Sequence, residues 1–253
     1  MIKFFYTYLI KILRRFGCNL SFSSDGEDFV IEKFLKNIDS GLYVDLGSNH
    51  PVKHSNTFNL YLRGWRGVCL DPIPNYSKKY SLYRPGDRFI NAGVNVSENE
   101  NINQLKFYFY QQFPDNSTFD YERVKHLEEV MNRKPSSILD VPVVTVKQII
   151  DELSAMVTDT TDIHFINVDI EGFEKKIIND IFALNIYPWL ICVEELNTFA
   201  CELFNGDIYS LMNENNYSFV AKTFLSSFYL RNDVIKKLPS EFIQEFFDEN
   251  TSS

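Results

Sequence analysis

The sequence predicts an α/β fold in which a mostly parallel sheet is covered by helices on both faces. Short, continuously apolar segments alternate with segments that carry apolar residues at helical spacing, which is typical of buried parallel strands joined by helices. The first apolar segment runs directly into a glycine, Gly47, in "YVDLGSN" (43–49). Near the C-terminus, two strand-like segments are separated by three residues, which predicts an antiparallel hairpin.

The elements of this fold follow one another in a regular order. A helix is predicted at residues 25–38, where apolar residues recur at helical spacing. Strands are predicted at 42–47, 67–72, 88–94, 163–169 and 189–195. Further helices are predicted at 55–64, 76–83, 172–184 and 198–215. The hairpin consists of 217–222 and 226–231, and we expect its antiparallel strand to close an edge of the sheet.

Residues 95–162 form a long insertion between the third and fourth predicted strands. The insertion contains strand-like segments at 105–110 and 141–146, with a charged, helix-prone segment at 121–134 between them. We expect it to cover an active site within a single domain that spans residues 21–253.

Composition restricts the classes of function. The chain has 253 residues, of which 45% are hydrophobic, enough for the core of one large domain. A formal net charge of −9 argues against a general nucleic-acid binder, because such proteins carry a basic surface. The sequence contains four cysteines, Cys18, Cys69, Cys192 and Cys201. They show no C-x-x-C spacing, which favours reduced thiols and a cytoplasmic location.

Residues 1–20 differ from the rest of the chain, since they contain four basic residues and no acidic ones. No apolar run here reaches the roughly 20 residues of a membrane span. Lys11 interrupts the apolar stretch, so a signal peptide is a poor fit. Two interpretations stay open. The segment is a helix packed on its own domain or on a partner chain, or it is a basic amphipathic helix at the anionic inner face of a membrane.

Polar residues stand where several predicted strands end, which is where ligands bind in open α/β sheets. They are Asp45, Asp71, Asn91, Asp169, Glu171, Glu194 and Glu195. Asp71 ends the second strand, and a carboxylate there can accept hydrogen bonds from both hydroxyls of a ribose. The alternative for Asp71 is a turn-forming residue before Pro72.

The glycine loop after the first strand contains only one glycine. A dinucleotide site uses G-x-G-x-x-G, because a pyrophosphate needs close approach of the backbone. Here Gly47 is followed by Ser48, Asn49 and His50. The pattern therefore favours an adenosine cofactor without phosphates, S-adenosylmethionine, whose cationic sulfonium suits a pocket with acidic strand ends. An NAD-dependent sugar-modifying enzyme stays as an alternative.

Six motifs, in order, carry a resemblance to a known family: "SFSSDGED" (21–28), "YVDLGSNHPVKHSNT" (43–57), "GWRGVCLDPIP" (64–74), "RPGDRFIN" (84–91), "NSTFD" (116–120) and "FINVDIEGFE" (165–174). This order closely resembles the FkbM family of methyltransferases, most of all the branch found among bacterial surface-glycan and secondary-metabolite genes. The similarity extends from about residue 21 to at least residue 195.

The resemblance implies a Rossmann-like, seven-stranded methyltransferase fold that uses S-adenosylmethionine. It assigns the Gly47 loop to the methionine end of the cofactor, Asp71 to the ribose and Asn91 to the adenine side. The cofactor-binding residues predicted in this way are Asp45, Gly47, Ser48, Asn49, Ser55, Thr57, Asp71 and Asn91. His50 departs from the family pattern, since many members have Asp at this position.

Methyl transfer to oxygen requires an aligned hydroxyl and a base that removes its proton. We expect Asp169 and Glu171, two residues apart, to lie nearest the reacting centre, with His50 as a further catalytic candidate. A second hypothesis uses acids as Mg²⁺ ligands, namely Asp169 with Glu194 or Glu195. The third interpretation is that these acids only orient the cofactor or cap helices.

The resemblance indicates an acceptor hydroxyl on a sugar or related small metabolite, in the biosynthesis of a bacterial capsule or surface polysaccharide. A phosphorylated or nucleotide-linked sugar is one option, with phosphate contacts from Arg63, Arg66, Arg84 or Arg88. A non-catalytic relative that binds glycans or partner enzymes is the remaining alternative.

Overall fold

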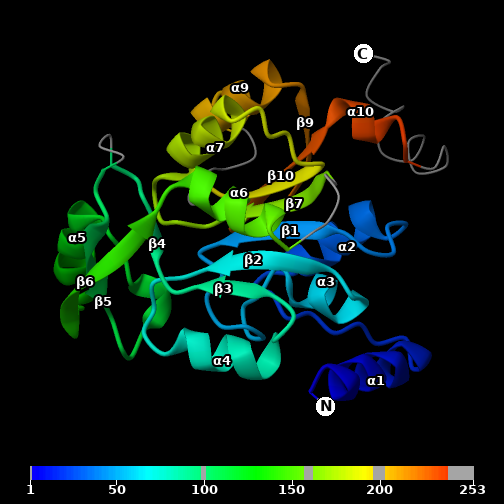
Figure 1. Cartoon of the computed structure of the whole chain (residues 1–253), viewed down its shortest axis with the longest axis horizontal. Coiled ribbons are helices and arrows are strands. Elements are labelled where there is room, and N and C mark those ends of the chain that lie inside the picture. The colour runs from blue at the N-terminus through cyan, green and yellow to red at the C-terminus, as the bar shows by residue number, and fades with distance from the viewer. Residues whose placement is uncertain (1, 98–100, 157–161, 196–202, 239–253) are drawn as a thin grey trace.

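The computed structural model describes residues 2–97, 101–156, 162–195 and 203–238. Within these residues, seven strands form the main sheet (Figure 1) in the order β3 (Arg88–Ile90), β2 (Arg66–Leu70), β1 (Leu42–Leu46), β7 (Ile163–Val168), β8 (Leu190–Glu194), β10 (Ser226–Arg231), β9 (Tyr217–Lys222). The strands from β3 to β8 are parallel, and β10 is antiparallel to both of its neighbours. The predicted α/β fold with a mostly parallel sheet is confirmed.

The strands alternate their side chains between two apolar cores, one on each face of the sheet. In β1, Leu42, Val44 and Leu46 enter one core, whereas Tyr43 enters the other. The first core is covered by α6 (Val146–Ser154), α7 (Glu174–Ala183) and α9 (Asp207–Glu214). The second is covered by α2 (Glu27–Leu35), α3 (Phe58–Arg63), α4 (Tyr76–Tyr83) and α10 (Asn232–Ile235).

The predicted C-terminal hairpin is confirmed, and one of its two antiparallel strands closes an edge of the sheet. β10 lies between β8 and β9, and β9 forms the edge. Burial explains this order. Phe228 and Leu230 enter one core and Tyr229 the other, so β10 is buried on both faces and needs a strand on each side.

The predicted strand at 88–94 is divided between two sheets. β3 ends at Ile90, and β4 (Gly93–Val94) pairs with β6 (Ser137–Val144) in a second sheet of order β4-β6-β5, in which β5 is Gln104–Phe109. Asn91 interrupts the strand, because its side-chain amide donates hydrogen bonds to the carbonyls of Asp71 and Ile73.

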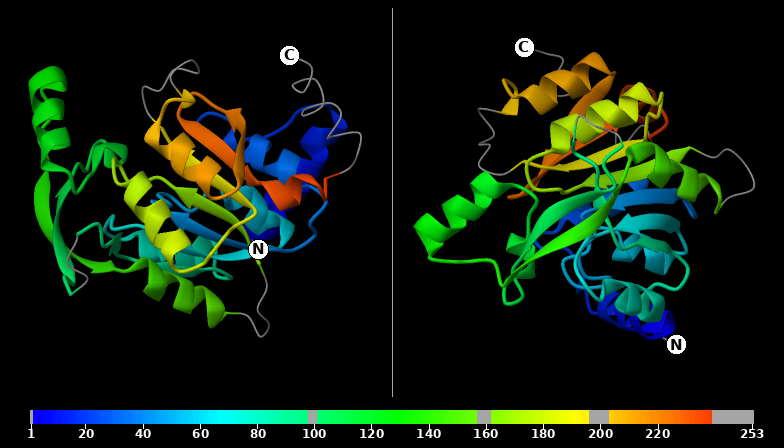
Figure 2. Two further views of the ribbon diagram at one scale, coloured as in Figure 1. Left: turned by 90° about the horizontal axis from the view of Figure 1, so that it is seen from above. Right: turned by 60° about the vertical axis from the view of Figure 1, so that its left-hand side comes forward.

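The second sheet, the short 3₁₀ helix η1 (Pro114–Asn116) and α5 (Tyr121–Met131) extend from one side of the domain (Figure 2). Helix α6, which is also within residues 95–162, packs instead on the core of the main sheet through Val146, Ile149 and Leu153. The predicted helix at 198–215 corresponds to α9 where the structure describes it, and its first residues, up to 202, lie outside the described residues.

The N-terminal segment forms the helix α1 (Ile2–Arg15), which lies against α3 on the outside of the domain (Figure 1). Tyr6 and Ile10 pack against the apolar cluster that contains Val52 and Phe58. Among the described residues, no helix combines the length and apolar character needed to cross a bilayer.

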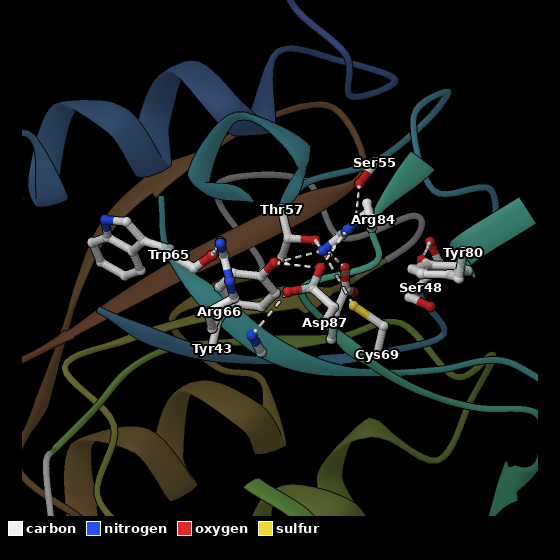
Figure 3. Close-up of polar contacts among 12 residues, drawn as sticks. Tyr43, Ser48, Ser55, Thr57, Trp65, Arg66, Cys69, Tyr80, Arg84 and Asp87 are labelled. Atoms are coloured by element: carbon white, nitrogen blue, oxygen red, sulfur yellow. Dashed lines mark hydrogen bonds and ion pairs between the residues drawn. The ribbon is translucent and has the colours of Figure 1, made fainter. Parts of the chain in front are cut away.

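An ion pair without exposure to water lies among polar side chains of β1 and of the residues that precede α3 (Figure 3). Arg84 Nε donates to Asp87 Oδ2 at 2.7 Å, and both side chains are 0% exposed. The Arg84 guanidinium also donates to the hydroxyl groups of Tyr43 (2.8 Å), Thr57 (3.0 Å) and Ser55 (3.3 Å). Most of the hydrogen-bonding capacity of the guanidinium is therefore used inside the protein.

The partners of this pair connect separate parts of the chain. Asp87 accepts hydrogen bonds from the Tyr43 hydroxyl on β1 (2.8 Å) and from the backbone of Gly67 on β2 (3.1 Å). Since Thr57 accepts a hydrogen bond from Arg84, its own hydroxyl donates to Asp45 at the end of β1, at 2.5 Å. The pair thus holds β1, β2 and the start of α3 in register below the strand ends.

We predict that Arg84→Met lowers the free energy of unfolding by about 3–5 kcal/mol, because it leaves the Asp87 carboxylate buried without a counter-charge. Urea denaturation followed by circular dichroism measures the change. The matched control is Arg88→Met, which removes a solvent-exposed pair with Glu152 and should cost less than about 1 kcal/mol. Equal losses in both variants would contradict this account, and replacing Asp87 by Leu in the Arg84→Met protein should restore part of the loss.

Candidate functional site

A cavity of about 300 Å³ lies where β1, β2, β7 and β8 end. Its walls come from the residues that follow these strands and from the second sheet with its connections, including Pro114, Asp115 and Arg123. The volume is at the lower limit of the ~300–1,000 Å³ of typical ligand sites. The position is the one predicted for ligand binding in an open α/β sheet.

The single-glycine loop forms one wall of this cavity. The backbone amides of Gly47 and Ser48 both donate to the carbonyl of Leu70 at 3.0 Å, which joins the loop to β2. Gly47 has φ +77°, and a Cβ atom there would lie 1.7 Å from the carbonyl oxygen of Asp169. Glycine is therefore required because β1 and β7 approach each other closely, whatever the cofactor.

Two carboxylates stand at the ends of β1 and β2. Asp71 is buried and lines the cavity, and its two oxygens accept hydrogen bonds from the backbone amides of Asn49 and Ile73, both at 2.8 Å. Burial raises the pKa of Asp71 to about 7. Each oxygen keeps a further lone pair, so the group can accept two more hydrogen bonds from a ligand. The Asp45 oxygens are used by Thr57 (2.5 Å) and Asn167 (3.0 Å).

Of the eight predicted cofactor residues, five line the cavity: Asp45, Gly47, Ser48, Asn49 and Asp71. Ser55 and Thr57 lie behind the wall, where they accept hydrogen bonds from Arg84. Asn91 holds the turn after β2 by donating to backbone carbonyls, and it is exposed without being among the cavity-lining residues. These three residues position the wall and are not part of its surface.

Three acids meet in the cavity at the ends of β7 and β8. Oxygen atoms of Asp169, Glu171 and Glu194 all lie within 4.8 Å of one another. Burial raises the pKa of Asp169 well above its usual range and the pKa of Glu171 to about 8. The negative charge of the nearby Glu194 is the second cause for both residues. Burial also raises the pKa of Glu194. The group therefore retains protons near neutral pH, or it pairs with a cation.

The conformation of Glu171 is unusual for a non-glycine residue. Glu171 has φ +62° and Gly172 follows with φ +104°. The turn is held by Glu174, whose carboxylate accepts hydrogen bonds from the backbone amides of Ile170 and Gly172. Arg123 of α5 forms an ion pair with Glu171 at 2.6 Å. Backbone strain of this kind is concentrated at functional sites.

Two candidates from the sequence lie away from this cluster. His50 is not among the cavity-lining residues, and its Nδ1 accepts hydrogen bonds from the backbone amides of Val52 and Lys53. Burial, with Lys79 nearby, lowers the pKa of His50 to about 4, so the ring is neutral at pH 7. Glu195 accepts a hydrogen bond from the Tyr229 hydroxyl, whereas the preceding residue, Glu194, faces the cavity. The third acid in the cluster with Asp169 and Glu194 is therefore Glu171 and not Glu195.

The second sheet and its connections supply site residues that local patterns did not indicate. Asp115 accepts a hydrogen bond from the Asn49 side chain at 2.6 Å, and Arg123 pairs with Glu171. Asn167 was also missed, although a polar residue inside an apolar strand is a usable signal. Its amide donates to Asp45, and its carbonyl oxygen accepts from Asn56.

The lining is strongly acidic. Arg123 is the single Lys or Arg among the described lining residues of the cavity. Six acids line it: Asp45, Asp71, Asp115, Asp169, Glu171 and Glu194. The four arginines considered for phosphate contacts lie elsewhere. Arg63 and Arg66 donate to backbone carbonyls, Arg84 is fully buried, and Arg88 pairs with Glu152. The described walls thus favour a cationic or neutral ligand.

We predict that Gly47→Ala lowers the free energy of unfolding by about 3–5 kcal/mol, because the new methyl group meets backbone atoms of β7 and the residue has positive φ. Thermal or urea denaturation measures the loss. Gly64→Ala is the control, since Gly64 also has positive φ (+105°) but a Cβ there meets no atom within 4 Å. It should cost only about 1–2 kcal/mol of strain. Indistinguishable costs would show that the contact with Asp169 is relieved easily.

A pH dependence of stability follows from Glu171. Its folded pKa of about 8 lies above the ordinary value, so the folded protein binds more protons than the unfolded chain between about pH 5 and pH 8. The contribution of this group to stability is present below the unfolded pKa and is lost as pH rises toward 8, by up to about 1.4 kcal/mol per pH unit.

Glu171→Gln removes this proton uptake. We predict that the variant gains stability relative to the unmodified protein as pH rises from 5 to 8, measured by urea denaturation in buffer with EDTA. Glu152→Gln, which changes an exposed acid, should give a constant difference. Parallel curves for Glu171→Gln would mean that Glu171 is ionised across this range.

The family model for the methyltransferase FkbM domain matches residues 45–219, which is more than half of the chain. No curated protein matches the chain. The matched region begins at Asp45, at the end of β1, and includes Asp71, Asp169 and Glu194. The chain belongs to the FkbM methyltransferase family.

Proposed function

We propose that the protein transfers a methyl group from S-adenosylmethionine to a hydroxyl group of a sugar or related small metabolite. The observation that carries the proposal is Asp71, a buried carboxylate at the end of β2 with two unused lone pairs and a place in the cavity wall. It lies in the same cavity as the three-acid cluster. The proposal therefore assigns ribose binding and the methyl transfer to one cavity.

The residues of the cavity fit this cofactor. Ser48 Oγ is buried without a hydrogen-bond partner among the described residues, and it lines the cavity, so a polar ligand would satisfy it. The excess of acids over bases favours the cationic donor over a pyrophosphate. When bound, S-adenosylmethionine supplies an electrophilic methyl group. Gly47, Ser48 and Asn49 would hold its amino-acid end and Asp71 its ribose.

The acids Asp169 and Glu171 support the step that the acceptor requires. The acceptor oxygen gains the methyl group and loses its proton, and a carboxylate of this pair takes the proton. A base of this kind contributes about 10²–10⁴ to a rate. Burial raises the pKa of both acids, so the ionised carboxylate of either one is a stronger base toward the hydroxyl proton. His50, with its occupied Nδ1, is the weaker candidate.

A divalent cation is a second way to use the same acids. The oxygens of Asp169, Glu171 and Glu194 are the type of ligand that Mg²⁺ prefers, and their separation permits a shared ion. Arg123 already offsets one of the three charges. We therefore treat Mg²⁺ as a condition to be varied in the binding experiment.

The acceptor class rests on the family resemblance, which indicates precursors of bacterial capsule or surface polysaccharides. The acidic lining favours an acceptor without phosphate groups. We place the reaction in the cytoplasm, in agreement with the free, buried thiols of Cys69 and Cys192. Cys201 lies outside the described residues.

We predict that S-adenosylhomocysteine binds the purified protein and that Asp71→Asn weakens this binding tenfold to a hundredfold, through loss of a charge-assisted hydrogen bond to the ribose. Isothermal titration calorimetry measures both affinities, with Mg²⁺ and again with EDTA. Asp151→Asn, which changes an exposed surface acid, is the matched control.

The outcomes separate the alternatives. An equal affinity of Asp71→Asn and the unmodified protein for S-adenosylhomocysteine would contradict the assignment of Asp71 to the ribose. Binding of NAD in place of S-adenosylhomocysteine would favour the oxidoreductase alternative. Retained S-adenosylhomocysteine binding without turnover of any hydroxyl acceptor would favour a non-catalytic relative.

A further inference from the structure

The helix α1 presents two different faces. Tyr6 and Ile10, four residues apart, pack on the domain, and the Tyr6 ring lies 5.6 Å from that of Phe22 and 5.3 Å from that of Phe58. Lys3 and Arg14 also turn toward the domain, with Lys3 Nζ over the Tyr61 ring and Arg14 paired with Glu32. The helix is thus anchored without use of its other face.

The other face is aromatic and basic. Phe4, Tyr8, Lys11 and Arg15 are spaced by four, three and four residues, so they form one stripe along the helix, and all four are exposed. Phe4 is 80% exposed and Tyr8 is 62% exposed, and Phe5 and Phe16 add two more exposed rings beside the stripe. Within the described part of the chain, Lys11 and Arg15 form no ion pair.

The charge of helix α1 is opposite in sign to that of the whole protein. Helix α1 contains four basic residues and no acid, whereas the chain as a whole carries −9. Exposed aromatic rings next to Lys and Arg are typical of helices that lie in the plane of a membrane, with the rings in the acyl boundary and the cations at lipid phosphates. At 14 residues, α1 is too short to span a bilayer.

We propose that α1 docks the protein on an anionic lipid bilayer through the stripe of Phe4, Tyr8, Lys11 and Arg15. The helix lies on the outside of the molecule (Figures 1 and 2), and the four side chains of the stripe are exposed. It packs on the cluster that contains Val52, in the loop whose Asn49 and His54 line the cavity. Docking would hold this wall of the cavity near the membrane surface. The proposal does not depend on the identity of the cofactor.

Vesicle flotation of the full-length protein tests the proposal. We expect binding to vesicles of equal parts phosphatidylglycerol and phosphatidylcholine, with little binding to phosphatidylcholine alone. Lys11→Gln with Arg15→Gln should weaken binding about thirtyfold, since each basic residue near an anionic surface contributes about a factor of five. Phe4→Ser with Tyr8→Ser should weaken it at least tenfold, because the rings no longer enter the bilayer.

The matched controls replace the same types of exposed side chain, apolar and basic, on helices other than α1. Val130→Ser changes an apolar side chain that is 65% exposed on α5, and Lys147→Gln changes an exposed cation on α6. Both should bind vesicles like the unmodified protein. Titration with S-adenosylhomocysteine should be the same for all variants, so a failure of docking is separate from a failure of the cofactor assignment.

Three results would overturn the proposal. The first is no binding of the unmodified protein to the anionic vesicles. The second is unchanged binding in both α1 variants. The third is that the α1 face joins two copies of the chain, seen in sedimentation velocity as a dimer that Phe4→Ser with Tyr8→Ser converts to a monomer, without vesicle binding.

Discussion

The buried pair of Arg84 and Asp87 is the interaction on which the arrangement of the site depends. A guanidinium and a carboxylate without exposure to water are costly to bury unless hydrogen bonds satisfy them fully. Here Tyr43, Ser55 and Thr57 supply those bonds, and each comes from a segment that leads to or from the cavity. Because the requirement is strict, the pair holds these segments in one arrangement.

Above this support, the site concentrates negative charge. Asp45 and Asp71 end the first two strands, while Asp169, Glu171 and Glu194 meet at the ends of β7 and β8. Burial disfavours the ionised forms of these acids and raises their pKa values, and like charges close to one another add to the effect at Asp169 and Glu171. A cationic ligand relieves the repulsion. The electrostatic character that disfavours ionisation of these acids thus also agrees with the cationic methyl donor that we propose.

The second sheet and its connections complete the site through two contacts. Asp115 meets Asn49 of the glycine loop, and Arg123 meets Glu171 of the acid cluster. Both contacts lie in the cavity wall, so movement of this part would change the glycine loop and the acid cluster together. The position of Glu171, at positive φ between Arg123 and Glu194, couples the conformation of the backbone to the charge of the cavity.

The sequence by itself determined the fold class and the edge of the sheet at which the cavity lies. Alternation of apolar side chains in strands and their recurrence in helices are local periodicities, and a strand that ends in Asp71 or Gly47 puts that residue at a known edge of the sheet. Only the tertiary structure decided which strand end faces which neighbour. It turned Glu194 into the cavity and Glu195 away from it, moved Ser55 and Thr57 behind the wall, and brought Arg123 to Glu171. These outcomes depend on contacts between residues far apart in the chain, such as 123 and 171, and no local periodicity encodes them.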